Sequence, residues 1–369
     1  MKIEKNSFHT ETQRVEIEKG KFMEQKVSPQ YVQTSLAASL TLGFQQGAFH
    51  RNAKLKGLNI LLHYSEGCMG SCHFCGLSKS RKESPKGKTF IRVDWPVYSL
   101  EEIVEKASGK NQIHRVCISM ITHPRALEDT LYVIRRFKEK TDLYISVLIS
   151  PTLIRREDSL KAMKGAGADR IGIAIDAATP ELFDRLRGKG VGGPHRWNHY
   201  WEVVQKAVNV FGRFYVGIHL IVGLGETEKE LVKAIQKGQD LGAYTHLFSF
   251  FPEKGSPMEG HSPPPLDQYR RIQLSRWIIN GGLGPAGQMK FDETGRLIDF
   301  GMDVHPLIEI GEPFMTSGCP GRDGKAACNR PYGNERPSGP IRNFPFMPEP
   351  EDIEEIKKQL EYWKDGILE

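Results

Sequence analysis

Residues 170–223 read RIGIAIDAATPELFDRLRGKGVGGPHRWNHYWEVVQKAVNVFGRFYVGIHLIVG, and this stretch decides the fold. It begins with a nearly continuous apolar run, passes through two segments of helical periodicity, and ends with a second apolar, β-branched run. Such strands, separated by helices, are typical of parallel βα units, in which both faces of each strand are covered. The stretch therefore predicts two parallel strands, at 170–176 and 215–223, joined by helices at 180–188 and 198–212.

The same alternation extends along the chain in both directions. Further strands are predicted at 59–65, 115–120, 143–150 and 246–252, and further helices at 99–108, 126–140, 156–167, 226–242 and 266–282. About six βα units fit a partial TIM barrel of the α/β class, in which the loops after the carboxyl ends of the strands carry the chemistry. A doubly wound parallel sheet is the alternative.

Two other segments flank this barrel, which is predicted to span residues 55–283. Residues 1–54 contain an amphipathic stretch, 30–49, and are predicted to form a helical N-terminal cap. Residues 284–369 are rich in Gly and Pro, and their stretch SGCPGRDGKAACNRPYGNERPSGP (317–340) has little apolar content. We expect this irregular tail to be held by something other than a core, and a closing helix is predicted at 349–367.

Composition excludes several classes of protein. Of 369 residues, 39% are apolar and 26% charged, which is ordinary for a globular protein. The net charge of +6 comes from basic residues scattered among acidic ones, so no nucleic-acid footprint is expected. The N-terminal residues form no signal-peptide apolar region, and no run approaches the ~20 apolar residues of a membrane span. We therefore expect a cytoplasmic protein without a membrane or nucleic-acid partner.

Three of the six cysteines lie within eight residues, in the order Cys68-x3-Cys72-x2-Cys75, directly after the first predicted strand. In a long chain whose thiols stay reduced, clustered cysteines more often bind metal or act in catalysis than form disulfides. Three thiolates on one tight loop suit three corners of a [4Fe–4S] cube with one iron left open, and Phe74 is placed to face a planar base. A zinc knuckle or three structural cysteines are the alternatives, although zinc usually takes four ligands in two pairs.

This cysteine loop, following the first strand of a βα series, resembles that of the radical S-adenosylmethionine (SAM) superfamily. The resemblance implies a [4Fe–4S] cluster on Cys68, Cys72 and Cys75, whose open iron takes the amino and carboxylate groups of SAM. Reduction of the cluster then cleaves SAM to methionine and a 5′-deoxyadenosyl radical, so the cofactor carries the difficult chemistry.

The resemblance also implies other SAM contacts. The stretch HLIVGLGE (219–226) is similar to a family pattern on the fifth strand through Ile221 and Glu226, with His219 where a glycine is expected. Asp176 resembles the polar fourth-strand residue that family members direct at SAM. Arg196 stands where biotin-synthase-like relatives place an arginine for the methionine carboxylate. The alternative for 219–226 is a strand that ends in a turn. For Asp176 it is a helix N-cap, and for Arg196 a surface arginine.

The three remaining cysteines are Cys117, on the second predicted strand, and Cys319 and Cys328, in the tail. A lone strand cysteine is usually ordinary core. Together with the tail pair it provides three more thiolates for an auxiliary [4Fe–4S] cluster, which would supply folding free energy to the tail. A redox-inert pair or a separate zinc site is the alternative. The fourth ligand is left open among Ser338, Ser317, solvent, substrate and an added sulfide.

The tail resembles the C-terminal region of the two-protein type of lipoyl synthase, a biotin-synthase-like branch. This resemblance implies a radical SAM sulfurtransferase that inserts sulfur into an unactivated C–H position of a protein-bound octanoyl chain. The adenosyl radical would remove hydrogen, and the auxiliary cluster would donate sulfur. The N-terminal cysteine run and the Arg-Ser-Ser-Tyr of single-chain lipoyl synthases are not found in this sequence.

The same resemblance implies three partners. They are an octanoylated lipoyl-carrier protein (H-protein or the lipoyl domain of an acyltransferase) as substrate, a second lipoyl synthase subunit, and an electron donor such as ferredoxin or flavodoxin. Two other functions stay open: another biotin-synthase-like reaction on a free small molecule, and a non-catalytic iron–sulfur carrier.

Overall fold

The predicted apolar runs form six neighbouring parallel strands in the computed structural model, which describes residues 26–81, 93–331 and 339–361. These strands are β2 (Gly57–Leu61), β4 (Arg115–Ser119), β5 (Tyr144–Ile149), β6 (Arg170–Asp176), β7 (Val216–Val222) and β8 (Ala243–Ser249). Their order in the sheet follows their order in the sequence. A doubly wound sheet would reverse its strand order at a switch point. The partial TIM barrel is therefore confirmed, and the doubly wound alternative is wrong.

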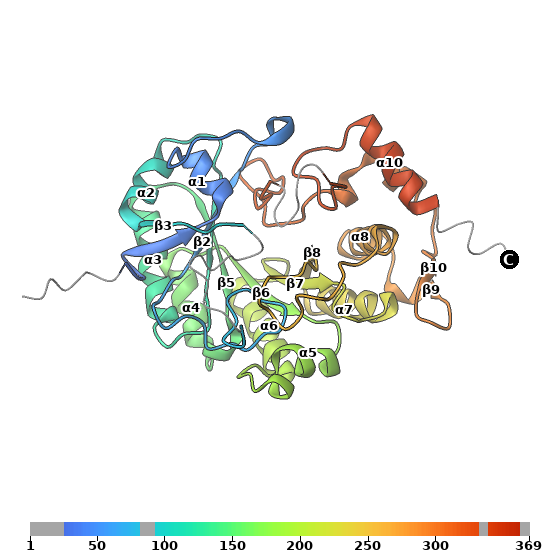
Figure 1. The fold of residues 1–369 in the computed structure, drawn as a ribbon, viewed down its shortest axis with the longest axis horizontal. Helices are drawn as coiled ribbons and strands as arrows, with labels where there is room; N and C mark the ends of the chain where they lie inside the picture. The colour runs from blue at the N-terminus through green and yellow to red at the C-terminus, as the bar shows by residue number, and fades with distance from the viewer. Residues whose placement is uncertain (1–25, 82–92, 332–338, 362–369) are drawn as a thin grey trace, which may run out of the picture.

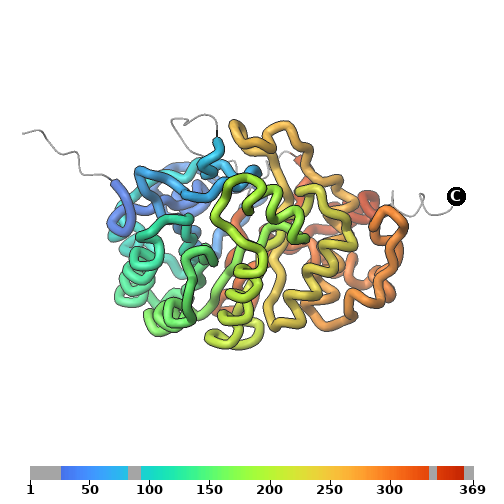
Figure 2. The backbone as a smooth tube through the Cα atoms, turned by 90° about the horizontal axis from the view of Figure 1, so that it is seen from below, coloured from blue at the N-terminus to red at the C-terminus, as the bar shows by residue number. Residues whose placement is uncertain are grey.

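Helices follow the strands and lie along the outside of the curved sheet (Figures 1 and 2). They are α2 (Leu100–Ser108), α3 (Ala126–Lys140), α4 (Glu157–Ala166), α5 (Pro180–Arg187), α6 (Trp197–Phe211), α7 (Glu228–Leu241) and α8 (Leu266–Asn280). Helix α7 begins with a capping box, in which Thr227 and Glu230 each accept a hydrogen bond from the other's backbone N–H, at 3.2 and 2.7 Å. These bounds agree with the predicted helices to within two residues at each end.

Strand β7 shows how the barrel wall divides its residues between two environments. Successive side chains of a strand point to opposite faces. The outward set (Val216, Ile218, Leu220 and Val222) is almost fully buried beneath the helices. The inward set includes His219 and Ile221, which line a cavity inside the barrel. The outer face therefore supplies the core, and the inner face is left for chemistry.

The N-terminal segment differs from the predicted helical cap. Residues of the stretch 30–49 form strand β1 (Tyr31–Thr34), which pairs antiparallel with β2 and with β3 (Val97–Ser99), before the short helix α1 (Leu36–Leu42) begins. A purely helical cap is therefore wrong. The open edge of β2 provides backbone partners for residues 31–34, and such tertiary pairing overrides a weak local period.

The C-terminal tail closes the barrel between its first and last strands. Ser317 accepts a hydrogen bond from the backbone N–H of Leu247 on β8, at 3.4 Å. At the other side, the buried Asn329 accepts from the N–H of Lys56 at 3.0 Å and donates to the carbonyl of Lys54 at 2.9 Å, directly before β2. Figure 1 shows this segment lying between α1 and α10 (Pro350–Glu361). The tail thus spans the gap that six strands leave open.

Apolar packing also contributes to the order of the tail. Phe314 and Phe344, which flank the Gly/Pro-rich stretch, are 0% and 3% exposed, and the N–H of Phe344 donates to the carbonyl of Phe314 at 3.0 Å. These residues lie outside the stretch 317–340, for which a hold other than a core was expected. The stretch itself contributes little apolar surface, but its aromatic neighbours anchor it on both sides.

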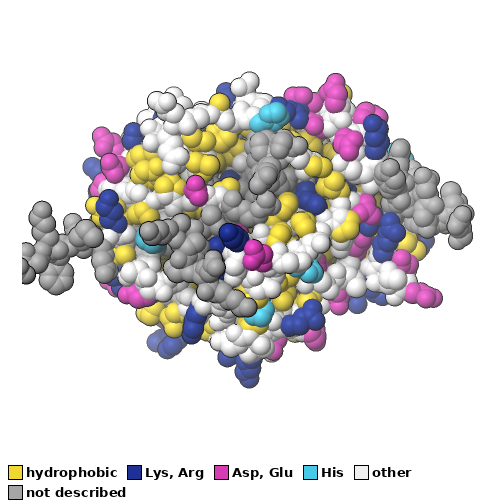
Figure 3. Space-filling model, in the orientation of Figure 1, with side chains coloured by type: hydrophobic (Ala, Val, Ile, Leu, Met, Phe, Trp, Pro, Cys, Tyr) yellow, Lys and Arg dark blue, Asp and Glu magenta, His cyan; other side chains and the backbone are white. Residues whose placement is uncertain are grey.

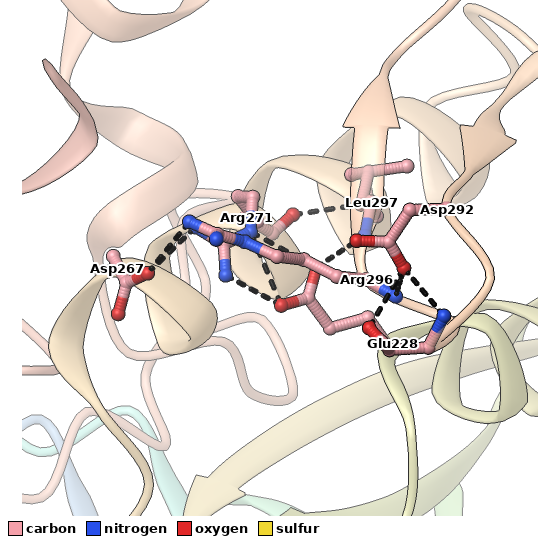
Figure 4. Close-up of polar contacts among 8 residues, drawn as sticks. Glu228, Asp267, Arg271, Asp292, Arg296 and Leu297 are labelled. Carbon is pink, nitrogen blue, oxygen red and sulfur yellow. Dashed lines mark hydrogen bonds and ion pairs between the residues drawn. The ribbon is translucent and has the colours of Figure 1, made fainter. Parts of the chain in front are cut away.

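A second anchor joins the barrel to the hairpin of β9 (Lys290–Phe291) and β10 (Leu297–Asp299), which precedes α9 (His305–Ile310). The buried carboxylate of Glu228, at the start of α7, accepts from Arg271 of α8 and from the N–H of Leu297 at 2.9 Å (Figure 4). Arg271 also donates to Asp267 at 2.9 Å. The hairpin is therefore fixed to the barrel by the carboxylate of Glu228, which Arg271 holds in place. Among the described residues, none of the helices combines the length and apolar character that crossing a membrane requires.

Candidate functional site

The three-cysteine loop leaves β2 at the carboxyl end of the parallel strands, where barrels carry their active sites. Three backbone hydrogen bonds fix it. The N–H of Met69 donates to the carbonyl of Thr122, that of His73 to Leu186, and that of Lys79 to Gly70, each at 2.8 Å. The loop is therefore held by itself, by the loop after β4 and by helix α5.

Cys68, Cys72 and Cys75 all line one cavity of about 300 Å³ inside the barrel. The N–H of Gly70 donates to Sγ of Cys68 at 3.3 Å, and the N–H of Leu77 donates to Sγ of Cys75 at 3.4 Å. Such bonds stabilise a thiolate. Burial nevertheless raises the pKa of Cys72 to about 11 and that of Cys75 well above its usual value, so a metal must displace these protons on binding. This donor set fits a metal cluster.

The spacing of these thiols distinguishes two kinds of metal site. Within the described ranges, no three His, Cys, Asp or Glu side chains converge closely enough to hold a single metal ion. A [4Fe–4S] cube spreads its thiolate ligands over separate iron atoms. Three thiols on one loop that line one cavity are the ligands that such a cube takes when one iron is left open.

A buried arginine lies beside this loop, and sequence reasoning missed it. Arg187, at the end of α5, is 5% exposed and lines the cavity. It donates to the carboxylate of Asp176 and, at 3.1 Å, to the hydroxyl of Tyr200. Burial raises the pKa of Asp176, and the charge of Arg187 opposes that rise. The same charge lowers the pKa of Cys72, which helps to stabilise an anionic cluster at this end of the cavity.

His195 packs behind the cysteine loop. Its Nδ1 lies 2.7 Å from Oγ1 of Thr152 and 2.8 Å from the hydroxyl of Tyr200, and burial lowers its pKa to about 2. A Cβ added to Gly70 would lie 3.0 Å from Nε2 of His195 and 3.4 Å from Sγ of Cys68. The loop therefore needs glycine here in order to fit between the neutral imidazole and its own thiols.

The cavity includes three of the residues that resemblance assigns to SAM. Phe74, Asp176 and Ile221 line it together with the cysteine loop. Asp176 has a φ of 64°, in the left-handed region where a residue without a functional or structural constraint is seldom found. These three residues therefore share one space with the thiols.

The other two SAM assignments lie elsewhere. The carboxylate of Glu226 accepts hydrogen bonds from the N–H groups of Gly223 and Leu224 at 2.7 and 2.9 Å, so it fixes the turn after β7 and does not line the cavity. Arg196 is exposed and donates to the carbonyls of Gly193 and His195 at 2.8 and 2.6 Å. Neither side chain lines the cavity, whereas Arg187 does, and their contact with SAM stays a prediction.

The structure brings together the other three cysteines, which also line this cavity. Cys117 points inward from β4, in register between Asn59 and Ser146 of the adjacent strands. The S–H of Cys328 donates to the sulfur of Cys117, which lowers the pKa of Cys117 and raises that of Cys328. Burial raises the pKa of Cys319 to about 11. A second triad thus faces the space that the first triad faces.

Two features hold the tail cysteines in place. A Cβ on Gly318 would lie 2.4 Å from the carbonyl oxygen of Cys328, so the two ends of this loop approach closely only because residue 318 is glycine. Arg115, 1% exposed, donates from Nε to the carbonyl of Pro320 at 2.8 Å and from both terminal nitrogens to Asp169. The proposed ligand Ser338 lies outside the described residues.

Arg330 places a second positive charge at this triad. Its side chain lines the cavity, and its charge opposes the rise in the pKa of Cys328 that the hydrogen bond with Cys117 and burial cause. Its own pKa is lowered by burial. Each thiol triad therefore has a buried arginine beside it, Arg187 at one and Arg330 at the other.

Between the triads the cavity wall is mainly hydrophobic. The apolar side chains that line it are Leu61, Leu77, Trp95, Met120, Ile121, Val147, Leu148, Ile149, Ile221, Leu247, Phe248, Phe250 and Phe251. Hydrophobic side chains also gather across the middle of the face that Figure 3 shows. Such a wall suits an apolar substrate and keeps water from a reactive intermediate.

Comparison with known proteins agrees with this geometry. Residues 62–238 match the family model of the radical SAM superfamily, whereas no curated protein matches the chain. Similar solved structures include methylornithine synthase (PylB), at a TM-score of 0.47 and 16% identity over 66% of this chain and 66% of that chain. HydG, a maturase of the [FeFe]-hydrogenase, matches at a TM-score of 0.48 and 13% identity over 66% of this chain and 54% of that chain. The chain thus spans just under two thirds of the first protein and about half of the second.

The matched family implies a [4Fe–4S] cluster and SAM, the groups that the three-cysteine loop and its cavity fit. The matched range contains that loop, strands β4 to β7, and the buried pair of Asp176 and Arg187. Residues 62–238 of this chain therefore form a radical SAM superfamily domain.

Proposed function

We propose that this chain is a sulfurtransferase of the lipoyl synthase type, which inserts sulfur into an unactivated C–H position of a protein-bound octanoyl chain. The observation that carries the proposal is the pair of thiol triads on one apolar cavity. A hydrogen atom is removed at one triad and sulfur is delivered at the other, so the substrate carbon never has to leave the cavity between the two steps.

The chemistry requires both groups because an unactivated C–H bond offers no acidic proton to a base. When bound, the first cluster and SAM supply a 5′-deoxyadenosyl radical, which takes one hydrogen atom from the alkyl chain and leaves as 5′-deoxyadenosine. Cys117, Cys319 and Cys328 would hold the auxiliary cluster, which would supply the sulfide for the new C–S bond and the iron that takes up the electron released. A ferredoxin or flavodoxin supplies the electron that cleaves SAM.

The protein's own residues bind, orient and shield. Cys68, Cys72 and Cys75 hold the first cluster, and Cys117, Cys319 and Cys328 hold the second. The apolar wall between them packs against an alkyl chain and excludes water. Arg187 and Arg330 place one positive charge beside each anionic cluster.

The substrate and partners of this proposal are macromolecular. An octanoyl group on a lysine of a lipoyl-carrier protein enters the cavity as a long, thin arm, and the carrier itself stays outside. A second lipoyl synthase subunit performs the other sulfur insertion.

Anaerobic counting of iron and sulfide with Mössbauer spectroscopy tests the two clusters first. Wild type is expected to hold ~8 iron atoms, and both Cys68→Ala/Cys72→Ala/Cys75→Ala and Cys117→Ala/Cys319→Ala/Cys328→Ala are expected to hold ~4, because each triad retains its own cube. Each triple variant is the matched control for the other. A wild-type count of ~4 that falls to none in the first variant would refute the auxiliary cluster.

The substrate is tested next with an octanoyl-lysyl peptide, SAM and a reductant. The expected products are 5′-deoxyadenosine and a peptide that has gained sulfur, both measured by mass spectrometry. The variant Cys117→Ala/Cys319→Ala/Cys328→Ala is expected to form 5′-deoxyadenosine without adding sulfur to the peptide. Two intact clusters with SAM cleavage but an unchanged peptide would favour the alternative, a related enzyme acting on a free small molecule. Clusters without any SAM cleavage would indicate an iron–sulfur carrier.

A further inference from the structure

A histidine on the inner wall separates the main cavity from a smaller one. His246 points inward from β8 and lines both the cavity of about 300 Å³ and a second cavity of about 210 Å³ near the first residues of the strands. Gly318 and Cys319 are the other residues that line both. The imidazole and the Cys319 thiol therefore lie in the same partition, beside the auxiliary triad.

His246 is 9% exposed, and its Nδ1 is buried without a hydrogen-bond partner among the described residues. A buried polar atom left unpaired costs about 1–3 kcal/mol, so such atoms are usually satisfied by a group of the protein, by water or by a ligand. An imidazole nitrogen is also a common ligand of iron. The unpaired atom thus marks a position where a bound iron would supply the missing partner.

The backbone around His246 makes room for the ring. A Cβ on Gly217, on the inner face of β7, would lie 2.8 Å from both Nε2 and Cδ2 of the imidazole. The ring therefore packs over a glycine, which fixes one of its edges against the barrel wall. His219, its direct partner in register, lies at a ring-centroid distance of 5.7 Å and an interplanar angle of 79°.

Hydroxyl groups at this end of the cavity already have partners. Ser146 hydrogen-bonds to the thiol of Cys117 and lies 3.5 Å from the carbonyl of Val116. Ser317 accepts from the N–H of Leu247 at 3.4 Å. Either would have to give up a contact to bind iron, whereas Nδ1 of His246 would not.

We propose that Nδ1 of His246 is the fourth protein ligand of the auxiliary cluster held by Cys117, Cys319 and Cys328. This assignment rests on the function proposed above and adds the ligand that the cysteines leave undefined. A neutral imidazole in place of a fourth thiolate makes the cluster less anionic, which raises its reduction potential. The cluster then accepts an electron more readily as carbon binds its sulfide.

The test uses the full-length chain carrying Cys68→Ala/Cys72→Ala/Cys75→Ala, so that only the auxiliary cluster is present. The chain is labelled with ¹⁵N-histidine and reconstituted anaerobically with iron and sulfide, and the reduced cluster is examined by pulsed EPR for hyperfine coupling to nitrogen. A directly bonded ¹⁵N is expected in this background. The coupling should disappear when His246→Gln is added and persist with His219→Gln, a matched control on the adjacent strand.

Two further variants separate ligation from folding. In the wild-type background, His246→Gln should retain the ~4 iron atoms of the first cluster, which shows that the barrel is intact. In the triple-alanine background, it should release auxiliary iron to a chelator at least about tenfold faster than the parent. His246→Cys should restore slow release without any nitrogen coupling.

The outcomes also separate this inference from the proposed function. A cluster of ~4 iron atoms without histidine coupling, or with coupling that survives His246→Gln, would overturn the ligand assignment and leave the auxiliary cluster standing. A triple-alanine chain that binds no iron would overturn both.

Discussion

Replacement of Arg115 by Gln is expected to destabilise the protein and to release the tail from the barrel. Arg115 begins β4, and its guanidinium makes three hydrogen bonds, to the carbonyl of Pro320 at 2.8 Å and to the two oxygens of Asp169 at 2.8 and 2.7 Å. Pro320 directly follows Cys319. The arginine therefore connects the wall of the barrel with one arm of the second triad.

The expected loss of stability follows from the hydrogen bonds of Arg115 that a glutamine cannot re-form. A side-chain amide has neither the charge nor the forked donors of a guanidinium, so at most one of the three bonds can re-form. Loss of one partner from a buried ion pair costs about 3–5 kcal/mol. Because the side chain of Asp169 is 33% exposed, water can solvate it afterwards, and we reduce the expected loss to about 3 kcal/mol.

The assay is anaerobic urea unfolding of the cluster-free protein, followed by circular dichroism. Arg115→Lys should lose less stability than Arg115→Gln, because lysine keeps the positive charge although it lacks the paired N–H donors of the guanidinium. Arg322→Gln is the control, since this exposed tail arginine makes one hydrogen bond to the carbonyl of Asp142 at 3.0 Å and should change stability by less than about 0.5 kcal/mol. Equal losses for Arg115→Gln and Arg322→Gln would refute the reasoning.

Three other outcomes are expected. Gly318→Ala should reduce the iron content from ~8 to ~4 atoms, because the new Cβ collides with Cys328. The control Gly287→Ala has open space around its Cβ and should keep ~8 iron atoms. Equal iron counts in the two variants would contradict this prediction. Asn329→Ala should cost about 3 kcal/mol in denaturant unfolding, since it removes bonds to Lys54, Lys56 and Pro345, and an unchanged midpoint would show that they contribute nothing. For Asp267, burial raises the pKa, but the hydrogen bond and charge of Arg271, the N–H of Gln268 and the charge of Arg296 together outweigh it, so the folded pKa lies below the usual ~3.9. The stabilisation by this carboxylate is therefore complete above pH ~4 and is lost as pH falls through the folded pKa, and Asp267→Asn should show a shallower acid decline; parallel unfolding curves from pH ~7 to pH ~2.5 would argue against it.

The sequence predicts best those strands and helices that have a local pattern of their own, such as a bounded apolar run. Strand β6 occupies the predicted residues 170–176, because its apolar run is bounded by a charged residue at each end. The last strand was predicted at 246–252 but spans Ala243–Ser249. Phe250 and Phe251 extend the apolar run beyond the strand, and both line the cavity from the loop that follows. Aromatic residues that serve the cavity are thus indistinguishable in sequence from strand residues.

The residues of the site likewise fall into those with a local sequence pattern and those without one. The first triad is a local spacing, and its residues line one cavity as predicted. Arg115, Arg187 and His246 carry no such spacing. A buried arginine is identified by the carboxylate or carbonyl it meets, and those partners are fixed only by the tertiary fold. For the same reason the sequence pointed to Arg196 and gave no sign that Arg187, close to it in sequence, lines the cavity.

The closing role of the tail sets an order for the assembly of the protein. During synthesis, the loop of Cys68, Cys72 and Cys75 is complete once eight consecutive residues have been made, while Cys117 must wait about two hundred residues for Cys319 and Cys328. The βα units can pair as they appear, since their contacts are between neighbours along the chain. The second triad therefore forms last, when the tail that carries Cys319 and Cys328 closes the barrel.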